Sequence, residues 1–99
     1  MDQAKIEEIT ALIDRASENE ALSALGEMLP RELPSDARSS ILFAAEAAKS
    51  ARQTLADAIA AATDGKLAIA AAIAQEAHSS AALVTGRLKN AEMMRRAGR

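Results

Sequence analysis

His78, the only histidine of the chain, is the side chain with the widest chemical range in this sequence. A neutral imidazole can ligate a metal, transfer a proton or accept a phosphoryl group. Glu76 is two residues away, so on a helix it cannot share a face with His78. The sequence has no second histidine and no cysteine to complete a metal site. The pattern therefore predicts no metal.

A helical bundle with a single histidine resembles the histidine-phosphotransfer domains, in which an exposed imidazole on a helix accepts a phosphoryl group. That family places a lysine and a glycine within one turn after the histidine, where charge and space favour the phosphoryl group. In this chain Ser79, Ser80, Ala81 and Ala82 follow His78. We expect an ordinary histidine beside a helix seam, and phosphotransfer through His78 is the alternative function.

Other catalytic patterns are missing from the sequence. Its serines suit helix caps and small surface positions, and nothing marks a general base beside them. The absence of cysteine excludes thiol catalysis, disulfides and Cys-based zinc sites, and there is no glycine-rich phosphate loop. We expect a protein that is not an enzyme and binds no cofactor.

Charge is uneven along the chain, whose net charge is −2. Residues 1–36 hold nine acidic and three basic residues, and residues 86–99 hold one acidic and five basic residues. A basic end can contact phosphates, so a nucleic-acid accessory role is a second alternative. With no Tyr or Trp to stack on bases, we expect nucleic acid not to be the partner.

These side chains would be positioned by two long helices rich in alanine, which fills 26 of the 99 positions. Seven-residue periodicity from Ile41 gives two apolar stripes, as in a pair of supercoiled helices. The first stripe contains Ile41, Ala44, Ala48, Ala51, Leu55, Ala58 and Ala62. The second contains Leu67, Ala70, Ala74, Ala77, Ala81, Val84, Leu88 and Ala91. The spacing predicts an antiparallel hairpin over residues 35–92.

The hairpin is expected to turn at residues 64–65. Gly65 suits the left-handed conformation at a helix C-terminus. Asp64 could cap the second helix, and Ser35 and Asp36 could cap the first. One continuous helix with Gly65 inside it is the alternative, because an interior glycine costs only about 1 kcal/mol.

Residues 1–29 are predicted to form one or two N-terminal helices. Ile6, Ile9, Leu12 and Ile13 share one helical face, and Ser17 with Glu20 has the spacing of a capping box. Residues 30–34 contain two prolines and form a connector, and residues 93–99 are expected to fray into a basic tail. The predicted fold class is all-α, an antiparallel Ala-rich helical hairpin with one or two N-terminal helices packed on it (a three- or four-helix bundle), forming a single domain.

Several large apolar residues fall outside the two stripes, and an exposed apolar strip usually marks a binding site. We expect this strip to bind another protein or a second copy of the chain, as a homodimer, with Phe43 as its anchor. The acidic start has no apolar signal segment, and polar residues interrupt the most apolar run, so we expect a cytoplasmic protein with no membrane contact. The residues assigned to this partner-binding strip are Leu42, Phe43, Ile69, Ile73 and Leu83.

Overall fold

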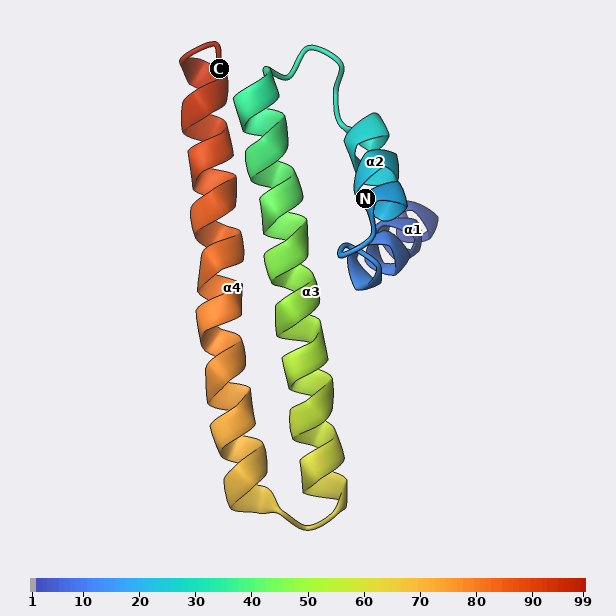
Figure 1. Cartoon of the computed structure of the whole chain (residues 1–99), viewed down its shortest axis with the longest axis vertical. Helices are drawn as coiled ribbons and strands as arrows, with labels where there is room; N and C mark the ends of the chain where they lie inside the picture. Colours follow the sequence, from blue (N-terminus) through green and yellow to red (C-terminus); the bar gives the residue numbers. More distant parts are fainter. Residues whose placement is uncertain (1) are drawn as a thin grey trace.

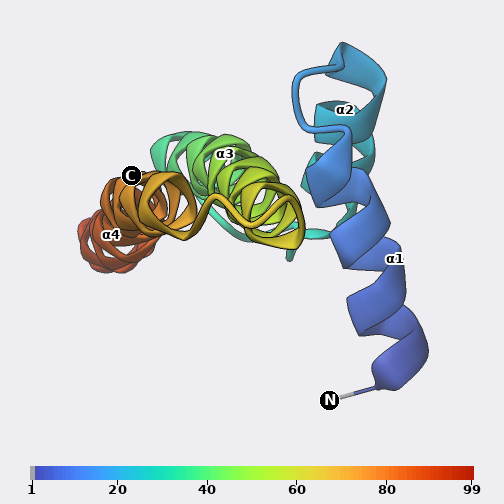
Figure 2. The same ribbon diagram turned by 90° about the horizontal axis from the view of Figure 1, so that it is seen from below.

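The computed structural model describes residues 2–99, which form four α-helices. These are α1 (Gln3–Asp14), α2 (Asn19–Met28), α3 (Ser35–Thr63) and α4 (Leu67–Arg96). The long helices α3 and α4 run antiparallel side by side (Figure 1). The short helices α1 and α2 lie against α3 on its far side from α4, and α1 crosses the hairpin instead of running along it (Figure 2). The predicted all-α fold with an antiparallel hairpin is confirmed.

The turn of the hairpin lies where the sequence predicts it. Gly65 has φ +78°, a left-handed conformation that favours glycine. Its amide donates to the Ala62 carbonyl, and the Lys66 amide donates to the Ala61 carbonyl, both at 3.0 Å. Together these two bonds form a Schellman motif that closes α3. Helix α3 therefore ends at this turn, and the alternative of one continuous helix is excluded.

The expected side-chain caps are wrong. The N-cap residues of α2, α3 and α4 are Glu18, Pro34 and Lys66, and none of them makes a side-chain cap bond. Ser17, expected to cap α2, instead accepts a hydrogen bond from Lys49 Nζ on α3 at 2.6 Å. Asp64 ends α3 as its C-cap and does not start α4. Ser17 and Asp36 contact residues of other helices or of the C-terminal turn instead, and Asp64 is part of the glycine turn.

The first free amides of α3 are satisfied by the far end of the chain. The backbone carbonyl of Arg99 accepts from the amides of Asp36 and Ala37, at 2.7 and 3.1 Å. The Arg99 guanidinium also pairs with the Asp36 carboxylate at 3.1 Å. A carbonyl oxygen at a helix N-terminus is stabilised by the free amides and the helix dipole. The two ends of the hairpin are thus tied together.

The expectation that residues 93–99 fray is also wrong. α4 continues to Arg96, and Gly98 then turns the chain with φ +76°. The Arg99 amide donates to the Met94 carbonyl at 2.7 Å, and the Gly98 amide donates to the Arg95 carbonyl at 3.1 Å. This is a second Schellman motif, so the same glycine device ends both long helices.

Alanine forms nearly the whole interior. Among residues 2–99, nine of the ten buried apolar residues are alanine, and the tenth is Leu25. On the hairpin they recur at seven-residue spacing: Ala37, Ala44, Ala51 and Ala58 on α3, and Ala70, Ala77 and Ala91 on α4. If Ile41 and Leu67 are taken as position a of the seven-residue repeat, these alanines occupy position d, so the d positions form the seam between the two helices.

The larger a positions of the same stripes do not join the seam. Leu55, Leu67 and Leu88 are 50%, 69% and 46% exposed. Alanines at d allow the two helix axes to approach closely, and a leucine does not fit in so narrow a contact. These three leucines of the predicted stripes are therefore not interior, contrary to what the periodicity predicts.

Two arginines of α3 hold the N-terminal helices in place. Arg38 donates to the carbonyls of Gly26, Pro30 and Leu33, at 3.0, 2.6 and 3.2 Å. It thus binds the end of α2 and the connector at once. Arg52 makes a two-bond contact with the Asp14 carboxylate at the end of α1, at 2.6 and 3.1 Å.

Candidate interaction surface

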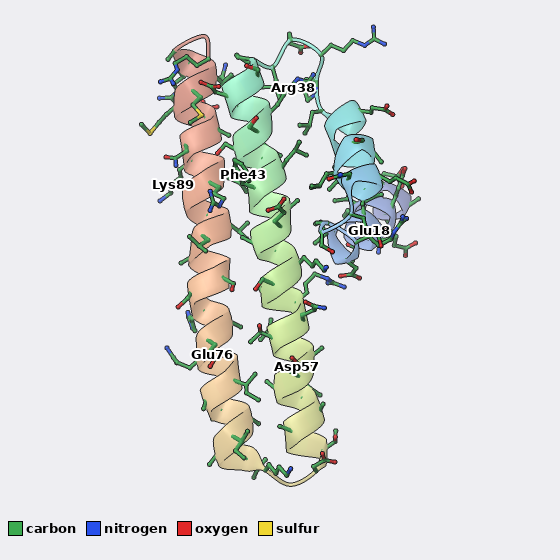
Figure 3. All side chains as sticks on the ribbon, in the orientation of Figure 1. Glu18, Arg38, Phe43, Asp57, Glu76 and Lys89 are labelled. Atoms are coloured by element: carbon green, nitrogen blue, oxygen red, sulfur yellow. The ribbon has the colours of Figure 1, made fainter. Side chains whose placement is uncertain are left out.

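Four of the five predicted partner-binding residues lie on one face of the hairpin, and three of these four are exposed. Phe43, Ile69 and Leu83 are 51%, 54% and 51% exposed, and Ile73 is half-buried. We call the side of α3 and α4 that carries these four residues the front face. In Figure 3, Phe43 lies in its upper half.

Leu42 is separated from the other four residues. It is half-buried, and its Cδ1 atom lies 4.0 Å from the position that a Cβ on Gly26 would take. It therefore faces α2, and belongs to the contact that holds the N-terminal helices. The sequence shows Leu42 and Phe43 as adjacent apolar residues, but successive residues of a helix point about 100° apart.

Polar contacts fix how α3 and α4 align along the front face. Ser40 donates to the Arg87 carbonyl at 2.6 Å, and the hydroxyls of Ser50 and Ser80 lie 3.4 Å apart. The Arg87 guanidinium lies 5.4 Å from the centre of the Phe43 ring, within the range of a cation–π contact. The anchor residue expected from the sequence therefore carries a positive charge over its ring.

A second apolar surface lies on the opposite, rear side, and sequence reasoning missed it. An open groove of about 340 Å³ separates α1 and α2 from the hairpin. The lining residues Ile41, Ala48 and Leu88 belong to the stripes that the sequence predicts to lie between α3 and α4. The groove is lined by Lys5, Ile9, Ile13, Leu25, Met28, Leu29, Ile41, Ala44, Ala45, Ala48, Val84 and Leu88.

The candidate chemical sites stay dispersed. His78 is exposed on α4, and the structure records no hydrogen bond or ion pair to its ring among residues 2–99. No group of histidine, cysteine and carboxylate side chains that could hold a metal occurs within this range. The serines with resolved side-chain bonds contact a carbonyl, a lysine or another serine. The one contact that joins a hydroxyl to an amine is exposed, with Lys49 Nζ as the donor and Ser17 Oγ as the acceptor.

Most of the basic charge at the C-terminal end is already paired. Arg95 and Arg96 bind the Glu92 carboxylate, at 2.7 and 3.0 Å, and Arg99 binds Asp36. The hydrogen bonds from Arg95 and Arg96 lower the pKa of Glu92 to about 2. Three of the five basic residues after position 85 thus serve contacts within the chain.

α4 is long and apolar enough to cross a membrane, judged by length and composition, and among residues 2–99 no other helix is. Only 6% of its most apolar window is buried within the chain. A core helix of a soluble protein passes the same test of length and composition. What distinguishes α4 is that its apolar side chains have so little cover in this fold.

Comparison of the chain with protein-family models, with curated proteins and with solved structures gave no match.

Proposed function

We propose that this chain is a non-catalytic protein–protein interaction module of the cytoplasm, acting as an adapter, a chaperone or an inhibitor that sequesters a regulator. The observation that carries the proposal is the inverted placement of its apolar residues. Small alanines fill the interior, while nine large apolar side chains of residues 2–99 are exposed, seven of them to half or more of their surface. The exposed large residues are Ile6, Phe43, Leu55, Ile59, Leu67, Ile69, Leu83, Leu88 and Met93.

Energetics support this proposal. Burial of apolar surface stabilises by about 25 cal/mol per Å², so an alanine seam yields much less than a leucine seam. The side chains that would yield most upon burial are the ones left in water. A partner that covers them gains this free energy in the complex, whereas in the chain alone it goes unused.

The rear groove gives the contact its form. Residues of α1 and α2 line one side of the groove and residues of α3 and α4 line the other. All of these lining residues are apolar except Lys5. An amphipathic helix fits such a groove by inserting apolar residues spaced three and four apart. Lys5 at the edge favours an acidic residue on the polar side of that helix.

Paired substitutions test this proposal. Leu88→Asp places a charge in the rear groove, and Met93→Asp places the same charge on the same helix outside the groove lining. The tagged chain is recovered from its native cells after cross-linking, and bound proteins are identified by mass spectrometry. We expect a stoichiometric partner that Leu88→Asp loses by tenfold or more, about the effect of a buried unpaired charge, and that Met93→Asp retains.

Two results would contradict the proposal. One is a set of bound proteins that both substitutions leave unchanged, which would show that the groove is not used. The other is transfer of the unmodified chain to phospholipid vesicles on co-sedimentation, which would assign the apolar surface of α4 to a membrane. Circular dichroism of each variant shows whether the helices persist.

A further inference from the structure

The front side of α4 carries a stripe of eight residues whose charged and terminal members are self-complementary. Its members follow one another at alternating intervals of four and three residues, the spacing of one helical face. The midpoint of the stripe lies between Ala81 and Ala82, and about this point the apolar ends, Ile69 and Met94, and the opposite charges, Glu76 and Arg87, occupy equivalent positions. The α4 stripe consists of Ile69, Ile73, Glu76, Ser80, Leu83, Arg87, Asn90 and Met94.

We propose that the front face binds a second copy of this chain in an antiparallel, two-fold arrangement, with the α4 stripes of the two copies packed together. The inference rests on the proposed function, in that the chain works through its apolar surfaces, and it names the occupant of one of them. The rear groove stays available for a different partner.

The charges of the α4 stripe support the antiparallel arrangement. Glu76 and Arg87 are eleven residues apart, which is three helical turns or about 16 Å. That distance exceeds the Debye length of about 8 Å at physiological ionic strength, so the two charges do not pair within one chain. A two-fold axis through the stripe midpoint places Glu76 of each copy opposite Arg87 of the other. A parallel arrangement would set like charges at the same level.

The sizes of some facing side chains also favour the antiparallel arrangement. The same axis sets Ile69 opposite Met94 of the second copy, which joins two large apolar residues. Near the axis, Ser80 faces Leu83, so a small residue receives a large one, as interdigitated helices require. The remaining pair sets Asn90 opposite Ile73, which is half-buried in the single chain, and this polar–apolar pair does not add to the match.

Neighbouring elements leave the front face open. α1 and α2 lie on the side of α3 away from α4, so they do not cover the stripe (Figures 1 and 2). Near the level of the axis, α3 places the small side chain of Ser50 beside Ser80. Phe43 and Asp57 lie on the same face, seven residues to either side of Ser50 (Figure 3).

The available area is enough for a stable dimer. From Ile69 to Met94 the stripe is about 38 Å long at 1.5 Å per residue. A face two helices wide, about 20 Å, then covers about 800 Å², the area that each partner contributes to a standard interface.

A charge swap tests the pairing, with sedimentation equilibrium of the purified chain as the measurement. Arg87→Glu and Glu76→Arg each place like charges opposite one another at two symmetric positions. We expect either change to raise the dimer dissociation constant by about tenfold or more, and the double variant to restore it to within about threefold. Lys89→Glu makes the same charge change outside the stripe and leaves the constant unchanged.

Cross-linking tests the direction of packing, because the chain has no cysteine of its own. A mixture of Ile73→Cys chains and Asn90→Cys chains should form a disulfide between the two variants. Each variant alone should form none, since seventeen residues of helix, about 25 Å, separate the two positions. Disulfides within a single variant would show a parallel dimer and overturn the arrangement.

A strictly monomeric chain at micromolar concentration would overturn the inference as a whole. The proposed function fails on a different measurement, the loss of a cellular partner through Leu88→Asp in the rear groove. The two outcomes are therefore distinguishable, because front face and rear groove share none of the tested residues.

Discussion

The two halves of the hairpin share one alanine seam but differ in the polar contacts that hold them. We call residues 35–52 and 77–96 the open half, and residues 53–63 and 67–76 the turn half. The open half is held by the Arg38 contacts, the Arg52–Asp14 pair and the Arg99 carbonyl. Between residues 53 and 76, all of which the structure describes, no side-chain hydrogen bond joins one helix to another.

Exposure differs in the same direction. In the turn half, the buried residues are Ala58 and Ala70, while Leu55, Ile59 and Leu67 are at least half exposed. A region with few buried contacts opens at low free-energy cost. Contacts with α1 and α2 therefore stabilise one end of the hairpin and the alanine seam alone holds the other, while exposed large apolar side chains occur in both halves.

The largest expected effect comes from breaking the seam near the point where the halves meet. Ala51→Leu puts a large side chain into the close contact with α4, and overpacking of this kind costs about 1–3 kcal/mol. Ala56→Leu is the matched control, because Ala56 is exposed on the same helix and the change there costs less than about 0.5 kcal/mol. Chemical denaturation measures both, and equal stabilities would refute the seam.

A smaller effect should follow from releasing the clamp on the open half. Arg38→Met removes three hydrogen bonds to carbonyls of α2 and the connector. We expect a loss of about 1–2 kcal/mol, since a hydrogen bond to a charged group contributes more than a neutral one. Arg31→Met, at an exposed site in the same connector, is the control. Thermal melts that fall equally for both would show that Arg38 does not clamp α2.

The smallest effect concerns pH and the pair that attaches α1. The hydrogen bond from Arg52, with its charge, lowers the pKa of Asp14 below its ordinary value. A carboxylate with a lowered folded-state pKa stabilises above its unfolded pKa and loses that contribution as pH falls through the lowered value. We expect NMR titration of Asp14 to give a midpoint below 3.8, and Arg52→Gln to return it towards that value. An unchanged midpoint in Arg52→Gln would contradict the pair.

Much of the fold was predictable from local pattern. Gly65 is a glycine between two long periodic segments, and its left-handed conformation was anticipated for that reason. The front-face residues were predicted as a group, and three of them are half or more exposed. Leu42 was misplaced because α2, which it faces, is distant in the sequence. The rear groove was missed because its lining comes from all four helices and exists only where they meet.

The sequence by itself determined the helices, the turn and the seven-residue alanine seam, because each depends on residues that are neighbours along the chain. Tertiary structure alone decided which stripe residues became interior. Close approach at the d alanines moved the a leucines outward, and a heptad pattern does not contain that distance. The N-terminal end of α3 was likewise decided by Arg99, a residue remote in sequence whose carbonyl replaced the expected side-chain caps.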